Sequence, residues 1–97
     1  MKLTDEQIEA NLQDSNGWEL TSETWIKKAY TFPSFTKTMQ FINELADIAE
    51  KRQHHPHMTI DHSNVTIQLS TLDQGGLTQL DFESAHAYDL TYEKYHR

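Results

Sequence analysis

The feature that most constrains the fold is a long helical pattern that starts at Phe35 and lies between two pairs of strand patterns. Its apolar residues recur every three or four positions: Phe35, Met39, Ile42, Leu45, Ala46 and Ala49. This spacing is typical of a helix that buries one stripe. Ser34 can cap its start, and the helix must end by about His55, because the residue before a proline avoids helical backbone. The stripe needs a sheet or another helix to cover it.

Strand patterns stand on both sides of this helix. A short pattern covers residues 18–20, and a longer one follows it. In the longer pattern, one face carries Ile26, Lys28, Tyr30 and Phe32 at a period of two. Beyond the helix, residues 58–61 and 65–69 form a second pair, joined by a turn at 62–64. Two such pairs predict two hairpins in an antiparallel sheet.

Two further helices complete the order. Thr4 and Gln7 stand at the spacing of a capping box, so a first helix should begin directly after Thr4. Near the other end, Thr78 can cap a last helix, with Asp81 as its acidic partner three residues later. The order α-β-β-α-β-β-α, without repeats or linkers, predicts one α+β domain over residues 1–97. We expect a two-layer sandwich, in which three helices cover one face of a four-stranded antiparallel sheet.

The composition excludes several classes of protein. The net charge is −7 and the eight Lys and Arg residues are scattered, so we expect no direct binding of nucleic acid. Because there is no cysteine, neither a disulfide nor a thiolate metal site can form. The N-terminus is acidic, and no segment is apolar enough to span a bilayer, so we expect a cytoplasmic protein without membrane association. The edges and the uncovered face of the sheet predict a homo-oligomer.

Four of the six histidines fall within nine consecutive residues: His54, His55, His57 and His62. Histidine has the unperturbed pKa nearest neutrality, so this cluster is a candidate acid–base site. Glu50 precedes His54 by four residues, and its carboxylate can orient that imidazole from the same helix face. Ser70 and Thr71, at the end of the neighbouring strand, are placed to line one side of a small polar pocket.

Two other interpretations of the histidine cluster stay open. Histidines at the end of a helix often only complement the helix dipole. The same four histidines offer imidazole ligands that suit zinc, nickel or copper. Their spacing matches no established zinc pattern, however, so we expect no metal.

The spacing of these residues is similar to that of a known family. The segment 50–56 (Glu-Lys-Arg-Gln-His-His-Pro), the pair Ser70 and Thr71, and the segment 76–78 with Asp81 resemble pterin-4a-carbinolamine dehydratases. The similarity covers nearly the whole chain, and it implies the element order given above and a homodimer or homotetramer. It also implies loss of water from a 4a-hydroxytetrahydropterin to give the quinonoid dihydropterin, in tetrahydrobiopterin recycling. No metal or organic cofactor is needed for that reaction.

The resemblance also implies roles for individual residues. His55 would be the main proton carrier with His54 assisting, and Glu50 would orient the histidines. The residues around the pterin ring, some of them contacting it through backbone groups, would be Ser70, Thr71 and Asp81.

Two positions depart from the family pattern. Where most active members have a third histidine, this chain has Leu72, which cannot carry a proton. Where an aromatic residue usually follows the proline by six positions, this chain has His62. His57 and His62 are therefore candidate substitutes for the third histidine. Alternatively, the chain is a catalytically weakened member that acts as a protein-interaction or dimerization module, since some relatives double as dimerization cofactors of a transcription factor.

Overall fold

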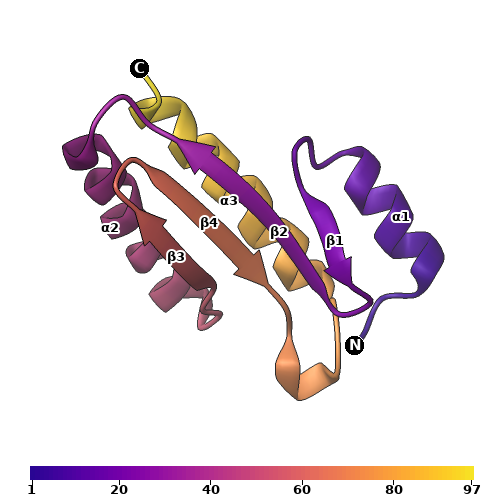
Figure 1. The fold of residues 1–97 in the computed structure, drawn as a ribbon. Helices are drawn as coiled ribbons and strands as arrows, with labels where there is room; N and C mark the ends of the chain where they lie inside the picture. Colours follow the sequence, from indigo (N-terminus) through magenta and orange to yellow (C-terminus); the bar gives the residue numbers. More distant parts are fainter.

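The computed structural model describes all 97 residues and confirms the order α-β-β-α-β-β-α (Figure 1). The elements are α1 (Asp5–Gln13), β1 (Glu19–Ser22), β2 (Trp25–Thr31), α2 (Phe35–Arg52), β3 (His57–Asp61), β4 (Asn64–Leu69) and α3 (Gln79–Tyr95). A 3-10 turn, η1 (Leu72–Gln74), is an addition to the predicted elements. All three predicted capping residues, Thr4, Ser34 and Thr78, precede their helices. The side chains of Thr4 and Ser34 accept hydrogen bonds from the backbone of the first turn.

The four strands form one antiparallel sheet in the order β1-β2-β4-β3. The two hairpins therefore meet at their inner strands, where Ile26 pairs with Leu69 and Tyr30 with Val65. All four of these side chains are buried. The predicted period of two in β2 is thus the alternation between a core-facing side and an open side, and β4 shows the same alternation.

The helices lie on the core-facing side of the sheet. In Figure 1, α2 and α3 run behind the strands, and α1 lies near β1 at one end. The amide of Gln79 in α3 donates to Asn11 in α1 at 3.4 Å, which places α1 beside the start of α3. Phe41 and Leu45 of α2, which have no exposed surface, belong to the same cluster as the buried strand residues. Ile42, Leu45 and Ala49 of the predicted stripe are buried, whereas Phe35 and Ala46 are exposed.

The end of α2 determines where the two adjacent histidines lie. Gln53 adopts left-handed backbone with φ of 51°, and its N–H donates to the carbonyl of Glu50 at 3.3 Å. The N–H of His54 donates to the carbonyl of Ala49 at 3.1 Å. Together these two bonds form a Schellman motif, which ends the helix and turns the chain sharply. The turn carries His54 out of the helical register, so its direction no longer follows from helical spacing.

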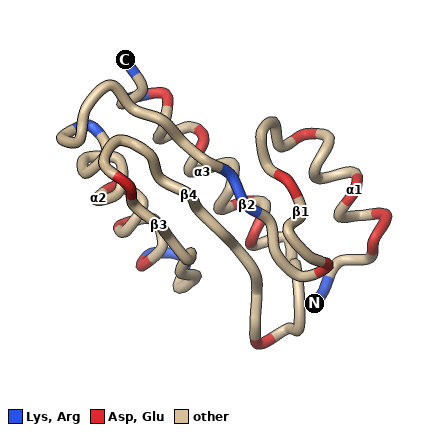
Figure 2. Tube along the Cα trace, in the orientation of Figure 1, with Lys and Arg blue, Asp and Glu red and all other residues tan.

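The open side of the sheet carries polar side chains along its central strands. Lys27 pairs with Gln68, which in turn pairs with His57, and Ala29 pairs with Thr66. The Lys and Arg positions are spread over several segments of the chain trace (Figure 2). None of the three helices combines the length and the apolar character needed to cross a membrane.

Asp89 of α3 joins three donors from the first half of the chain. Its carboxylate accepts from Tyr30 Oη at 2.5 Å, from Lys28 Nζ at 2.8 Å and from Trp18 Nε1 at 3.2 Å. Burial, together with the hydrogen bond to Asp89, raises the pKa of the Tyr30 phenol far above its ordinary value. Tyr30 is therefore a neutral hydrogen-bond donor near neutral pH.

Asp89→Ala is expected to lower the free energy of unfolding by about 2–3 kcal/mol, because three donors lose a charged acceptor. Urea denaturation followed by circular dichroism measures this loss. Asp89→Asn, which keeps an acceptor oxygen but not the charge, should cost less. Equal losses in the two variants would show that the charge, and not the acceptor, provides the stabilisation.

Candidate active site around His54 and Asp81

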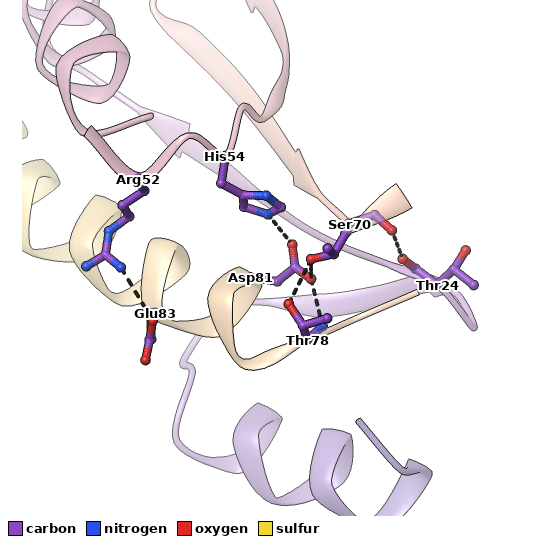
Figure 3. A network of polar contacts seen from close by, with 8 residues as sticks. Thr24, Arg52, His54, Ser70, Thr78, Asp81 and Glu83 are labelled. Atoms are coloured by element: carbon purple, nitrogen blue, oxygen red, sulfur yellow. Dashed lines mark hydrogen bonds and ion pairs between the residues drawn. The ribbon is translucent and has the colours of Figure 1, made fainter. Parts of the chain in front are cut away.

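His54 and Asp81 form a buried pair between the end of α2 and the first turn of α3. The distance between Nε2 of His54 and Oδ1 of Asp81 is 2.6 Å (Figure 3). His54 is 8% exposed, and Asp81 has no exposed surface at all. A carboxylate at the start of a helix is favoured by the dipole of that helix. The pair has the arrangement in which a buried carboxylate fixes the orientation of an imidazole.

Two threonines hold the other oxygen of Asp81. Thr71 Oγ1 donates to Asp81 Oδ2 at 2.8 Å, and the backbone N–H of Thr78 donates to the same oxygen at 2.9 Å. The hydroxyl oxygens of Thr71 and Thr78 lie 2.8 Å apart. These residues bring together the ends of α2 and β4 and the start of α3, which are distant in sequence. The site is therefore a product of the tertiary fold.

Ser70 and Thr71 were both predicted to face a pterin, but their hydroxyls bind the protein. Ser70 Oγ donates to the carbonyl of Thr24, in the turn between β1 and β2 (Figure 3). The Thr71 hydroxyl donates to Asp81. Both residues are buried. The backbone of Thr71 is bonded within the chain as well, since its N–H donates to the carbonyl of Gly76 at 3.1 Å and its carbonyl accepts from the N–H groups of Gln74 and Gly76. Both hydroxyls and the backbone of Thr71 are thus already engaged.

An open pocket of about 420 Å³ lies against His54. Most of its lining is polar, and the lining residues are Met1, Gln53, His54, Thr71, Asp73, Gln74, Thr78, Gln79 and Leu80. Amide and hydroxyl groups of this kind match a flat heterocycle that carries several hydrogen-bond donors and acceptors. Thr78 is expected from the sequence as the cap of the last helix, whereas only their position after folding identifies the glutamines.

His55 has a different partner and a different neighbourhood from His54. Its Nε2 contacts the Glu50 carboxylate, and both side chains are exposed, at 58% and 71%. Glu50 therefore orients His55, and the prediction that it also orients His54 through helical spacing is wrong. A second hollow, of about 210 Å³, lies beside this exposed pair. Its lining is largely apolar and comprises Leu45, Ala46, Ala49, Glu50, His55, Pro56 and Met58.

Neighbouring residues of the segment 53–56 line the two hollows. Gln53 and His54 line the polar hollow, and His55 and Pro56 line the apolar one. The chain thus places two imidazoles, each with its own carboxylate, on two sides of one short junction. The structure does not bring the two histidines into one pocket.

The candidate substitutes for the third histidine lie elsewhere. His62 stacks on Phe35, with ring centroids 6.1 Å apart, at the start of α2. The 18 residues of α2 span about 27 Å, so His62 is far from His54 within one chain. His57 is exposed on β3 and pairs with Gln68 on the open side of the sheet. Neither residue joins the His54–Asp81 pair.

Neither Leu72 nor Tyr88 offers a proton carrier near neutral pH. Leu72 directly follows Thr71 and is 72% exposed, so its side chain fills no core position. Tyr88, two turns beyond Asp81 in α3, is fully buried, and burial raises its pKa to about 12. Its phenol therefore cannot supply a proton carrier that works near neutral pH.

The clustered histidines have different neighbours in the structure. The structure contains no group of three or more His, Asp or Glu side chains arranged to hold a metal ion. His54 and His55 each bind a carboxylate, and His62 stacks on a phenylalanine. The four histidines that are close in sequence are thus separated in space.

Comparison with known proteins identifies relatives over most of the chain. The family model described as pterin 4 alpha carbinolamine dehydratase matches residues 1–91. A protein of Picosynechococcus sp., provisionally named pterin-4-alpha-carbinolamine dehydratase, is 38% identical over 88 residues, which cover 91% of this chain and 95% of the relative. A protein of Roseiflexus sp. with the same provisional name is 40% identical over 88 residues, covering 91% and 94% of the two chains.

Solved structures agree with this result. A transcriptional coactivator/pterin dehydratase from Brucella melitensis superposes with a TM-score of 0.91 at 26% identity, covering 95% of this chain and 99% of that one. A pterin dehydratase-like protein, identified as a RuBisCO assembly factor in the alpha-carboxysome, superposes with a TM-score of 0.68 at 22% identity, covering 79% and 90%. The second likeness shows the fold alone. The match of the family model and the identity to its relatives show that the chain belongs to the pterin-4-alpha-carbinolamine dehydratase family.

Proposed function

We propose that this protein dehydrates a 4a-hydroxytetrahydropterin to the quinonoid dihydropterin and water, as a step of tetrahydrobiopterin recycling. The bond between C4a and its hydroxyl oxygen breaks, and the leaving hydroxyl takes up a proton. A ring nitrogen loses a proton as the new double bond forms. One imidazole that donates and one that accepts satisfy this balance, so the reaction requires no metal or organic cofactor.

The observation that carries the proposal is the His54–Asp81 pair beside the polar pocket. A buried carboxylate bound to an imidazole at 2.6 Å fixes the ring, and the pocket offers amide and hydroxyl partners for a pterin. General acid–base help from one placed side chain typically accelerates a reaction by about 10²–10⁴-fold. An oriented imidazole is the kind of group from which that help comes.

His55 is the main proton carrier in this proposal, and His54 assists from a fixed position. The His55 imidazole is 58% exposed, so it can exchange protons with water between turnovers. Its Nε2 contacts the Glu50 carboxylate, which fixes the orientation of the ring. Because the two imidazoles line different hollows, the pterin in this proposal has to span the junction 53–56.

A direct assay tests the proposal. The purified protein is added to chemically generated 4a-hydroxytetrahydropterin, and the formation of the quinonoid product is followed against the spontaneous rate. Acceleration by the protein, in proportion to its concentration, supports the proposal. A rate equal to the spontaneous rate, from protein with a native circular dichroism spectrum, refutes it.

A second candidate function is that of a protein-interaction or dimerization module. It is favoured by Leu72, which replaces the usual third histidine, and by the Brucella melitensis relative, which is described as a transcriptional coactivator as well as a pterin dehydratase. This candidate predicts a folded homo-oligomer without dehydratase activity. A homodimer or homotetramer, located in the cytoplasm, is part of both proposals.

Leu72→His should raise the dehydration rate by about tenfold or more, because it restores a third proton carrier beside Thr71. The free energy of unfolding should change by less than about 0.5 kcal/mol, since the side chain is largely exposed. Leu72→Ala is the matched control and should leave the rate unchanged. An equal rate in the histidine and alanine variants would show that the third histidine is not needed here.

A further inference from the structure

The bonds around Asp81 determine which nitrogen of His54 carries its proton. We infer that Thr71 and Thr78 are positioning residues, which hold Asp81 so that neutral His54 is protonated on Nε2 and exchanges protons with a ligand through Nδ1. The location of the proton follows from the structure alone. The exchange with a pterin rests on the proposed function.

The Asp81 carboxylate has three hydrogen-bond partners, and they fix the position of the proton on His54. An ionised carboxylate can only accept hydrogen bonds, and a backbone N–H can only donate. The N–H of Thr78 therefore occupies Oδ2 as a donor, at 2.9 Å. Thr71 Oγ1 donates to the same oxygen at 2.8 Å, which leaves Oδ1 for His54 alone. Since Oδ1 can only accept, Nε2 of His54 must carry a proton.

The hydroxyls of Thr78 and Thr71 form a hydrogen-bonded chain that runs toward Asp81 in one direction. Thr71 has one hydroxyl proton, and it gives that proton to Asp81. The contact of 2.8 Å between the two threonine hydroxyls must then have Thr78 as donor and Thr71 as acceptor. The chain runs from Thr78 to Thr71 to Asp81, so neither hydroxyl is free to turn. Asp81 cannot rotate without breaking bonds on both of its oxygens.

The opposite side of the His54 imidazole carries Nδ1. Neutral imidazole carries one proton, so Nδ1 of His54 has a free lone pair when Nε2 is protonated. Nδ1 makes no hydrogen bond within the chain and is not among the buried polar atoms that lack a partner. His54 lines the polar pocket, which is therefore the place where Nδ1 can meet water or a ligand. This nitrogen is a base when the ring is neutral and an acid when the ring is charged.

The network makes a specific prediction for Asp81→Asn. The two donors at the position of Oδ2, from Thr71 and from the Thr78 backbone, require the amide oxygen there. The amide NH₂ group must then face Nε2 of His54, which can bind it only as an acceptor. The proton of the neutral ring is thereby forced onto Nδ1, so the nitrogen that faces the pocket loses its lone pair. A misassigned tautomer of this kind is known to be far more damaging to catalysis than the small change of shape suggests.

The test is long-range ¹H–¹⁵N NMR spectroscopy of the full chain with ¹⁵N-labelled histidine, at a pH at which the rings are neutral. His54→Gln assigns the His54 signals by their loss. The wild-type protein should show the Nε2–H tautomer for His54, and Asp81→Asn should show the Nδ1–H tautomer. In the dehydration assay, Asp81→Asn should lower kcat by about 10²–10⁴-fold with little change of KM.

Thr71 provides an independent test if Asp81→Asn does not fold. Thr71→Ser keeps the hydroxyl, and it should preserve both the wild-type tautomer signals and kcat. Thr71→Val keeps the shape but removes the donor, and it should broaden or mix the His54 tautomer signals and lower kcat. A role confined to packing would give the valine variant the wild-type spectrum.

Two results would overturn the inference: an Nδ1–H tautomer in the wild-type protein, or an unchanged tautomer in a folded Asp81→Asn variant. These results do not depend on any enzymatic activity. If the tautomers behave as stated but the wild-type protein does not accelerate dehydration, the proposed function fails and the inferred proton position stands.

Discussion

His55→Ala should reduce the rate of 4a-hydroxytetrahydropterin dehydration by about 10²–10⁴-fold, to near the spontaneous rate. The variant removes the exposed imidazole that contacts Glu50 and exchanges protons with water. Because the side chain is mostly exposed, the fold should be unaffected, and the urea midpoint should stay close to that of the wild type. The loss should appear in kcat, since a proton carrier acts on the transition state.

The matched control for this variant is His86→Ala. His86 is also an exposed histidine, but it lies on α3 and lines neither the polar nor the apolar hollow at the junction 53–56. Its replacement should leave the rate unchanged. If His55→Ala retains the wild-type rate, then His55 is not the proton carrier, and His54→Ala becomes the decisive variant.

Asp81→Ala should lower the free energy of unfolding by about 3–5 kcal/mol, the usual cost of removing one partner from a buried ion pair. Three groups lose their acceptor together: the His54 imidazole, the Thr71 hydroxyl and the Thr78 backbone N–H. The start of α3 also loses the carboxylate that favours its first turn. Urea denaturation, followed separately by far-ultraviolet circular dichroism and by tryptophan fluorescence, measures the loss and tests for two-state unfolding.

Glu83→Ala is the control for that measurement. Glu83 lies two residues after Asp81 in α3, and its exposed carboxylate meets Arg52 at 3.5 Å (Figure 3). An exposed pair of this kind contributes no more than about 1 kcal/mol. If the two variants cost the same, the buried network around Asp81 does not stabilise the fold, and its role would be confined to orienting His54.

The fold could be predicted from the sequence because its signals are local. The stripe that begins at Phe35, the alternation in β2 and β4, and the capping residues Thr4 and Ser34 each report the structure of their own segment. A short hairpin then leaves only one way for two strands to pair. The order of the strands in the sheet needed the further fact that the two inner strands, β2 and β4, are the most buried.

The site was predicted less well, because its partners are chosen by distant contacts. Helical spacing assigned Glu50 to His54, but the left-handed residue Gln53 ends the helix between them and turns His54 toward Asp81. Left-handed backbone is uncommon for glutamine, so nothing in the sequence marks this turn. The spacing of Thr78 and Asp81 did predict the helix cap. That spacing did not indicate that the same carboxylate also binds an imidazole 27 positions earlier in the chain.

The pairing of β2 with β4 has a consequence for how the chain folds. Each hairpin can close alone, but the central ladder, from Ile26 with Leu69 to Thr31 with Asn64, joins strands that are separated by the whole of α2. Closing that loop costs chain entropy before any cross-strand contact offsets it. A helix that forms early shortens the loop, since it rises only about 1.5 Å per residue. The apolar stripe of α2 therefore covers the sheet in the finished structure and also shortens the route by which its two halves meet.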